Sequence, residues 1–355
     1  MKIRKLLSLL LAMVMVVVLF AGCKGQTQTP GPQGGSDNTE QPKGDQILRL
    51  GASSFDGVFN PIMSDNVYDA YITDIIFEKL IDNTPEGEYV PGIAEWTLSE
   101  DNLTYTFTLK DGIKFSDGSD LTTEDVAFTY MAIAHPDYNG PRAYAVNNLV
   151  GYEEYHSGKT DTFEGIQIID EKTISFTFKE GTAAPANIES FDYGIMPKAY
   201  YEFENWEDFL ELLDKPLGSG IMVLDSWEPK QYIKLLKNEN YWDPENAAKI
   251  DGVLVSEVPE ESILSALQTN QIDFGQIFAN AENYQAALAM DNINVINYLG
   301  NGYTFMCFNT LRPTLSDVRV RQALMYALDR EAFIDVQYGE GLASVGMAPI
   351  SPSSW

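Results

Sequence analysis

The sequence predicts a mixed α/β protein, and two features of its 355 residues support that fold class. Segments with the alternating pattern of a strand are interleaved with segments that have the 3.6-residue period of a helix. Some strand segments are also joined by short turns, which is typical of antiparallel hairpins and argues against a purely parallel, doubly wound sheet. The length of the chain is sufficient for two lobes.

The first predicted elements are a strand at 47–50, a loop over 51–61 and a helix. The helix is indicated by apolar residues at i, i+3, i+4, i+7 and i+8, which are Tyr68, Tyr71, Ile72, Ile75 and Ile76. Apolar residues then alternate with threonine over 103–109, as in a half-buried strand. Thr122, with Asp125 three residues later, is an N-cap pattern that predicts a helix through Tyr130.

The later elements follow the same rules. A hairpin is expected from 166–169 and 173–178, which flank a short polar turn, and another strand is expected near 232–236. Helices are expected after Pro259 and near Asn280. A further helix is indicated by Val320, Ala323, Leu324, Ala327 and Leu328, with Ser316 or Asp317 as its cap.

The N-terminus has the pattern of a secretory signal. Three basic residues precede an apolar run from Leu6 to Phe20, and Ala21-Gly22-Cys23 follows. This site resembles a lipobox, with Phe20 where leucine is usual, and so predicts a signal peptide over 1–22 and lipidation of Cys23. We expect an extracytoplasmic protein that is anchored to the membrane by lipid. The alternative interpretations of the N-terminus are an uncleaved anchor and plain secretion. Residues 24–45 are almost devoid of apolar side chains and are expected to form a disordered tether.

Charge and composition exclude several functions. The formal net charge is −29, which disfavours nucleic acid as a partner. His135 and His156 lie in no metal-ligand spacing, so we expect no metal site and no cofactor. Cys307 has apolar neighbours and is predicted to be a buried thiol. No nucleophile elbow or phosphate-binding loop is present, and we treat carboxylate pairs such as Glu260-Glu261 as solvated surface, so no enzyme is expected.

Five segments, taken together and in order, resemble the oligopeptide/dipeptide/nickel-type (family 5) solute-binding proteins of ABC transporters. They are LTYTFTLKDGIKFSDGSDLTTEDVAFTY at 103–130, LGSGIMVLDSW at 217–227, NYW at 240–242, LQTNQIDF at 267–274 and DVRVRQALMYALDREAFI at 317–334. Asn270 stands where the family commonly has glycine, and Ile221-Met222 stand where it has Pro-Tyr.

The resemblance implies a type II, periplasmic-binding-protein-like clamshell. Lobe one would span 46–300, with an extra subdomain at about 80–165. A hinge strand at Tyr303–Asn309 would lead, within 301–355, into a second lobe that is incomplete at Trp355, with helices whose apolar faces lack partners. It also implies a monomer that captures a small peptide, or a related solute, and delivers it to ABC permease subunits.

The resemblance also implies candidate ligand contacts. The loop after the first strand, the residues after the Ile-Asp motif, the subdomain and the hinge strand each contribute some. They are Ser54, Phe55, Asp56, Tyr144, Gln276, Ile277, Phe278, Tyr303 and Phe305. For Tyr303 and Phe305 we favour core packing over ligand contact. A sensing or adhesion lipoprotein on the same fold, and a non-functional truncated product, are the alternative interpretations.

Overall fold

The computed structural model describes residues 46–85, 87–182, 184–298, 303–339 and 341–346. The predicted signal peptide over 1–22, the lipidation site Cys23 and the tether over 23–45 lie outside these ranges. None of the helices in the described part combines the length and the apolar character that crossing a membrane requires.

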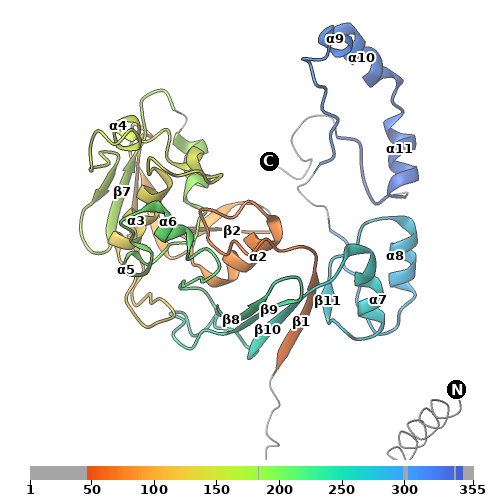
Figure 1. Ribbon diagram of the computed structural model, residues 1–355, viewed down its shortest axis with the longest axis horizontal. Helices are drawn as coiled ribbons and strands as arrows, with labels where there is room; N and C mark the ends of the chain where they lie inside the picture. Colours follow the sequence, from red (N-terminus) through yellow and green to blue (C-terminus); the bar gives the residue numbers. More distant parts are fainter. Residues whose placement is uncertain (1–45, 86, 183, 299–302, 340, 347–355) are drawn as a thin grey trace, which may run out of the picture. The chain divides into compact units, whose positions relative to one another are not determined.

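A mixed five-stranded sheet has the order β11-β1-β10-β9-β8 (Figure 1). Its strands are β1 (Ile47–Ala52), β8 (Met222–Glu228), β9 (Tyr232–Lys237), β10 (Gly252–Glu257) and β11 (Phe274–Gly275). β1 runs parallel to both β10 and β11, whereas β9 is antiparallel to β8 and β10. The sheet therefore combines parallel strands with a hairpin, as the sequence predicts.

Two helices pack on this sheet. Helix α2 (Val67–Ile76) contacts β8 and buries Ile72 and Ile76, while Tyr71 on the predicted apolar face is exposed. The chain passes closely beneath α2 at Gly218, where a Cβ atom would lie 2.3 Å from the carbonyl oxygen of Ile76. Helix α7 (Ile263–Gln268) contacts β1 and β11 and forms a small core with Ile272.

A second sheet is fully antiparallel, with the order β4-β5-β7-β6. Its strands are β4 (Ala94–Leu98), β5 (Thr104–Leu109), β6 (Ile166–Ile168) and β7 (Thr173–Thr177). The predicted hairpin is thus confirmed, and Tyr105, Phe107 and Leu109 are the buried residues of the predicted alternating strand. The sheet continues past residue 165, the end proposed for the extra subdomain.

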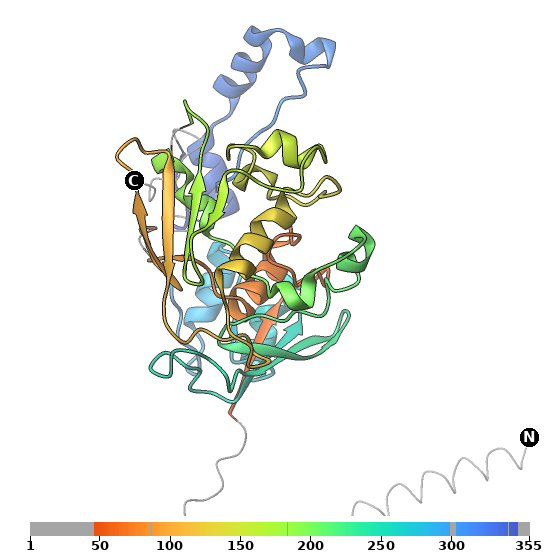
Figure 2. The ribbon, with the colours of Figure 1, turned by 90° about the vertical axis from the view of Figure 1, so that its left-hand side faces the viewer.

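Helix α3 (Thr123–Ile133) packs against β6 and β7 (Figure 2). Its N-terminus is closed by the predicted capping box, in which the Asp125 carboxylate accepts a 2.8 Å hydrogen bond from the backbone N–H of Thr122. The shorter elements around the two sheets are β2 (Ile81–Asn83), β3 (Tyr89–Pro91), η1 (Ala143–Ala145), α4 (Tyr152–His156), η2 (Ala184–Phe191), α5 (Lys198–Tyr201) and α6 (Trp206–Leu210).

The helices after β11 are α8 (Ala281–Leu288), α9 (Pro313–Ser316), α10 (Val318–Ala327) and α11 (Arg330–Gln337). Asp317 caps α10, as the sequence predicts. No side chain of α9, α10 or α11 is buried, and large apolar residues are exposed, among them Tyr326 at 90% and Val336 at 89%. The predicted exposure of apolar faces in this region is confirmed.

The segment from Tyr303 to Asn309 differs from the prediction. It forms no strand, and Tyr303 and Phe305 are exposed with their rings 5.6 Å apart, so the preference for core packing was wrong. Cys307 is also exposed, which corrects the prediction of a buried thiol. A strand needs a neighbour for its backbone hydrogen bonds, and the described residues provide none beside this segment.

Candidate functional site

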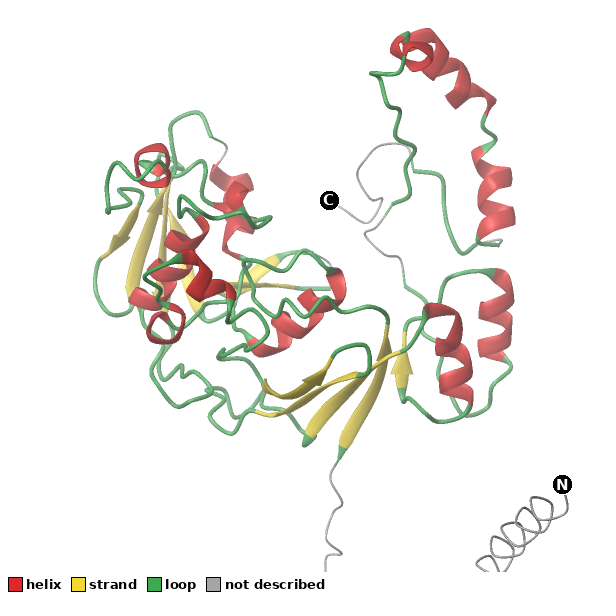
Figure 3. Ribbon diagram, viewed as in Figure 1, coloured by secondary structure: helices red, strands yellow, loops and turns green. Residues whose placement is uncertain are grey.

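Three parallel strands end at one edge of the five-stranded sheet, where Ala52 in β1 lies opposite Glu257 in β10 and Gly51 lies opposite Gly275 in β11. Because these strands are parallel, the loops that follow them emerge on the same side (Figure 3). The carboxyl edge of a sheet is where open α/β folds bind ligands. The topology thus brings together segments that are more than 200 residues apart in sequence.

A hollow of about 330 Å³ lies at this edge. Its lining residues come from the end of β1, from α2, from the starts of the η3 turn (Glu260–Ser262) and of α7, and from the segments that directly follow β11 and α11. They are Gly51, Ala52, Ser53, Tyr68, Glu260, Ile263, Gln276, Ile277, Phe278, Ala279 and Tyr338. Apolar walls with a few polar groups are typical of a small-molecule site.

The loop over 53–58 is fixed to α2 by Asp69, whose side chain is fully buried. One carboxylate oxygen of Asp69 accepts a hydrogen bond from the backbone N–H of Asp56 at 3.2 Å, and the other accepts one from Val58 at 3.0 Å. Burial raises the pKa of Asp69, and these backbone donors oppose that rise. Asp69 therefore sets the path of the loop after β1.

Three further hydrogen bonds shape this loop. The Asn66 side-chain amide donates to the carbonyl oxygen of Ser54 at 3.0 Å and to the carboxylate of Asp56 at 2.9 Å. Ser54 has φ of 54°, a left-handed conformation that few non-glycine residues adopt. Next to the hollow, the Ser53 hydroxyl donates to the Tyr68 hydroxyl at 2.8 Å. The loop is therefore held by side chains at the N-terminus of α2.

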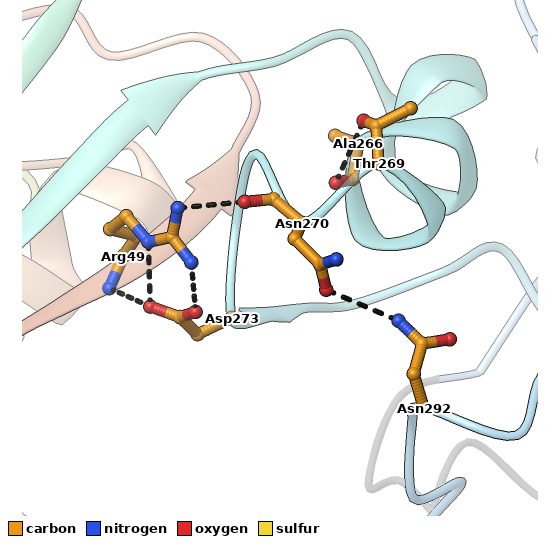
Figure 4. Close-up of polar contacts among 6 residues, drawn as sticks. All are labelled: Arg49, Ala266, Thr269, Asn270, Asp273 and Asn292. Atoms are coloured by element: carbon orange, nitrogen blue, oxygen red, sulfur yellow. Dashed lines mark hydrogen bonds and ion pairs between the residues drawn. The ribbon is translucent and has the colours of Figure 1, made fainter. Parts of the chain in front are cut away.

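On the other side, β11 is positioned by the ion pair between Arg49 in β1 and Asp273 (Figure 4). The Arg49 backbone N–H and Nε each donate to Asp273 at 2.9 Å, and the guanidinium also donates to the carbonyl oxygen of Asn270 at 2.7 Å. Hydrogen bonding from Arg49 lowers the pKa of Asp273. Asp273 immediately precedes β11, so this ion pair aligns β11 and the residues after it with β1.

Asn270 ends the α7 turn in a left-handed conformation, with φ of 55°. Asparagine tolerates this conformation better than most residues, which accounts for its presence where a glycine is common. Its side-chain oxygen accepts a 3.2 Å hydrogen bond from the Asn292 amide (Figure 4). The turn before Asp273 is therefore stabilised by hydrogen bonds to both the backbone and the side chain of Asn270.

Two aromatic rings close one side of the hollow. Phe278 and Tyr338 stack with centroids 6.0 Å apart and an interplanar angle of 27°. The Tyr338 hydroxyl is 3.2 Å from the hydroxyl of Thr304. Gly339 allows the close approach of α11 to α8, because a Cβ atom there would lie 2.8 Å from the Cβ of Ala281.

The structure brings together only some of the predicted contacts. Gln276, Ile277 and Phe278 line the hollow. Ser54, Phe55 and Asp56 lie in the adjacent loop but are not among the lining residues, and the same is true of the exposed Tyr303 and Phe305. Ligand contact by these residues stays a prediction.

Tyr144 lies in a different group. Its hydroxyl is hydrogen-bonded to the hydroxyl of Tyr193, and the Arg142 guanidinium lies 5.3 Å from the centre of the Tyr193 ring. Burial raises the pKa of Tyr193 strongly, and the bond to Tyr144 adds to the rise. Tyr144 is half-exposed and does not line the hollow.

Of the residues that line the hollow, the sequence predicted only Gln276, Ile277 and Phe278, and those that it missed include Tyr68, Glu260 and Tyr338. Tyr68 was assigned to the buried face of its helix, and Glu260 was treated as solvated surface. Glu260 follows β10, a strand that the sequence analysis did not predict and that runs parallel to β1. Tyr338 follows the last predicted helix and carries no motif that points to a site.

Comparison with known proteins identifies the family of this chain. Residues 88–355 match the model of the bacterial extracellular solute-binding proteins, family 5, middle region. The oligopeptide-binding protein AppA of Bacillus subtilis is 28% identical over 358 residues, which cover 100% of this chain and 63% of AppA. The dipeptide-binding protein of Escherichia coli is 27% identical, over 84% of this chain and 56% of that protein.

Solved structures agree with the sequence matches. AppA in complex with a nonapeptide has a TM-score of 0.75 at 27% identity, covering 88% of this chain and 60% of that chain. The substrate-binding protein CtaP of Listeria monocytogenes has a TM-score of 0.72 at 28% identity, covering 87% and 60%.

These relatives share the type II, periplasmic-binding-protein-like fold, and the chain spans less than two thirds of their length. These relatives are binding proteins and not enzymes. The family model covers most of this chain, so the protein belongs to family 5 of the bacterial extracellular solute-binding proteins.

Proposed function

We propose that this protein captures small peptides, or a related solute, outside the cytoplasm and delivers them to the permease of an ABC transporter. The observation that carries the proposal is the hollow at the carboxyl edge of β1, β10 and β11, in a chain that shares its fold with a protein solved in complex with a nonapeptide. No bond is made or broken in this role. The protein selects, holds and releases its ligand.

The chemistry of the hollow suits part of a peptide. Ser53, Gln276 and Tyr68 offer hydroxyl and amide groups to a peptide backbone, whereas Ile263 and Ile277 offer apolar surface to a side chain. Its volume lies near the lower end of the range of about 300–1,000 Å³ typical of small-molecule sites. We therefore propose that the hollow holds one end of a longer ligand, or one or two of its residues.

A hollow that holds only part of the ligand favours a clamshell mechanism. Ligand held against the carboxyl edge of the sheet stabilises a closed form only if a second surface also contacts it. The hinge at 303–309 and a second lobe that begins with α9 to α11 remain part of this proposal. The ligand then shifts the population of the closed form by its difference in affinity for the two forms.

Anchoring to the membrane through a lipid is part of the same proposal. Cleavage before Cys23 and acylation of its thiol would anchor the protein on the outer face of the cell membrane, and residues 24–45 would hold the folded part away from the bilayer. Labelling with a fatty-acid analogue in a bacterial host tests this: label should be lost in Cys23→Ser and kept in Cys307→Ser. Label on wild type and Cys23→Ser alike would contradict the assignment.

Titration calorimetry with di- to nonapeptides tests the capture of peptide. We expect saturable binding, and a loss of about tenfold in affinity in Gln276→Ala, as for the removal of one ligand hydrogen bond. Gln271→Ala is the matched control, because Gln271 is exposed in the preceding turn and does not line the hollow. Failure of every peptide to bind would overturn the proposal.

A further inference from the structure

Glu260 is the one charged side chain among the described residues that line the hollow, and no Lys, Arg or His joins it there. It begins the η3 turn shortly after β10 and is exposed, so it faces solvent at the rim and can meet an incoming group. The hollow therefore presents a single uncompensated negative charge to its ligand.

Three aromatic rings accompany this carboxylate. Tyr68, Phe278 and Tyr338 all line the hollow, and Phe278 and Tyr338 stack into one aromatic wall. Tyr68 also contacts the rings of Phe55 and Tyr71 edge-on, with centroids 6.1 Å and 6.2 Å away, which fixes its orientation. Aromatic faces attract cations through their quadrupole, most strongly where the cation is partly desolvated.

The charge of the whole chain acts in the same direction. With a formal net charge of −29, the surface draws cations toward the protein and repels anions. An anionic ligand group at this edge would meet both the field of the protein and the Glu260 carboxylate. A neutral group would leave the carboxylate without a partner, and a cationic group would pair with it.

We propose that this hollow selects a cationic group of the ligand, with Glu260 as its counter-ion and the rings of Tyr68, Phe278 and Tyr338 as its walls. This inference rests on the proposed function, since it names the class of peptide that the site takes. The cationic group is a lysine or arginine side chain of the peptide. Both have the same chemistry at a carboxylate.

The test uses pentapeptides of alanine in which one position in turn is lysine, arginine or norleucine, each with a free or an acetylated amino terminus. Affinities for the full chain are measured by titration calorimetry. We expect the best lysine or arginine peptide to bind about tenfold more tightly than its norleucine counterpart, from one exposed ion pair and one cation–π contact. Acetylation of the amino terminus should leave this preference unchanged, and a preference that acetylation abolishes would overturn the assignment to a side chain.

Glu260→Gln should abolish the preference for the cationic peptide while binding of the norleucine peptide with a blocked amino terminus persists. Glu261→Gln makes the same change of charge one residue away, at an exposed side chain that does not line the hollow, and should keep the preference. The preference should also shrink as salt is raised, because the pair is exposed.

The outcomes separate the two proposals. Equal affinity for cationic and neutral peptides, or an unchanged preference in Glu260→Gln, overturns the cation site while the capture of peptides stands. If no peptide binds to the wild-type chain, peptide capture and the cation site are overturned together. A loss of preference in Glu261→Gln equal to that in Glu260→Gln assigns the effect to general surface charge and likewise overturns the specific site.

Discussion

Replacing Asp69 by asparagine removes one of the two acceptors that hold the loop over 53–58 next to the hollow. Each oxygen of the Asp69 carboxylate accepts one backbone N–H, from Asp56 and from Val58. An asparagine has a single acceptor oxygen, and its NH₂ group must then face the other N–H. One hydrogen bond is lost and two donors are opposed at a fully buried side chain.

The expected loss of stability follows from that count. A buried donor left without a partner costs roughly 1–3 kcal/mol. Part of this is offset, because burial raises the pKa of Asp69 and the neutral amide is less costly to desolvate than the carboxylate. We therefore expect the free energy of unfolding to fall by about 1–2 kcal/mol near neutral pH.

Urea unfolding followed by tryptophan fluorescence is the assay. Trp227 is a local reporter, because its ring packs directly against Gly57 in the same loop. Asp65→Asn is the matched control: Asp65 is exposed and close in sequence, and its replacement should change stability by no more than about 0.5 kcal/mol. An Asp69→Asn variant as stable as the wild-type protein, or an equal loss in the control, would refute the role assigned to Asp69.

Three further predictions concern other parts of the fold. Gly218→Ala should lower the free energy of unfolding by about 1–3 kcal/mol, because its Cβ would overlap the backbone of α2, and an unchanged midpoint in calorimetric melting would contradict this. The arginine partner lowers the pKa of Asp273, so the ion pair contributes to the free energy of unfolding above the unfolded pKa of about 3.9, and this contribution disappears as pH falls through the folded value. Asp273→Asn should therefore be less stable than wild type at neutral pH and equally stable in acid. A difference in stability that persists in acid would contradict this. Tyr326→Ser, at a 90% exposed side chain, should change the free energy of unfolding by less than about 0.5 kcal/mol, whereas Phe107→Ala should cost about 3–5 kcal/mol; a comparable loss in both would show that α10 is packed in solution.

Local patterns in the sequence predicted much of the fold. The capping box of Thr122 and Asp125, the alternation at Tyr105 and Phe107, and the cap at Asp317 are all decided by residues within a few positions of one another. Such signals depend on backbone geometry and on the burial of one face, which a short segment already expresses.

Long-range pairing lay beyond these rules. Arg49 and Asp273 are 224 residues apart, and neither carries a pattern that identifies the other as its partner. The same holds for Tyr68, Glu260 and Tyr338, which meet only because β1, β10 and β11 end at one edge. Side-chain chemistry was readable from the sequence, but the topology that brings the side chains together was not.

The errors at the C-terminal side have a common cause. Tyr303, Phe305 and Cys307 were expected to be buried because apolar residues cluster there, yet they are exposed. An apolar segment is buried only if another element covers it, and among the described residues nothing pairs with this segment as a strand. Composition predicts the tendency to be buried, whereas the covering element decides the outcome.

Amide hydrogen exchange of the full chain, with and without a saturating nonapeptide, tests the assignment of the hollow most directly. Ligand at the carboxyl edge of β1, β10 and β11 should slow exchange in the segments 53–58 and 276–279, which border it. Protection confined to other surfaces, such as the surroundings of Tyr144 and Tyr193, would show that the peptide binds elsewhere and would contradict the account.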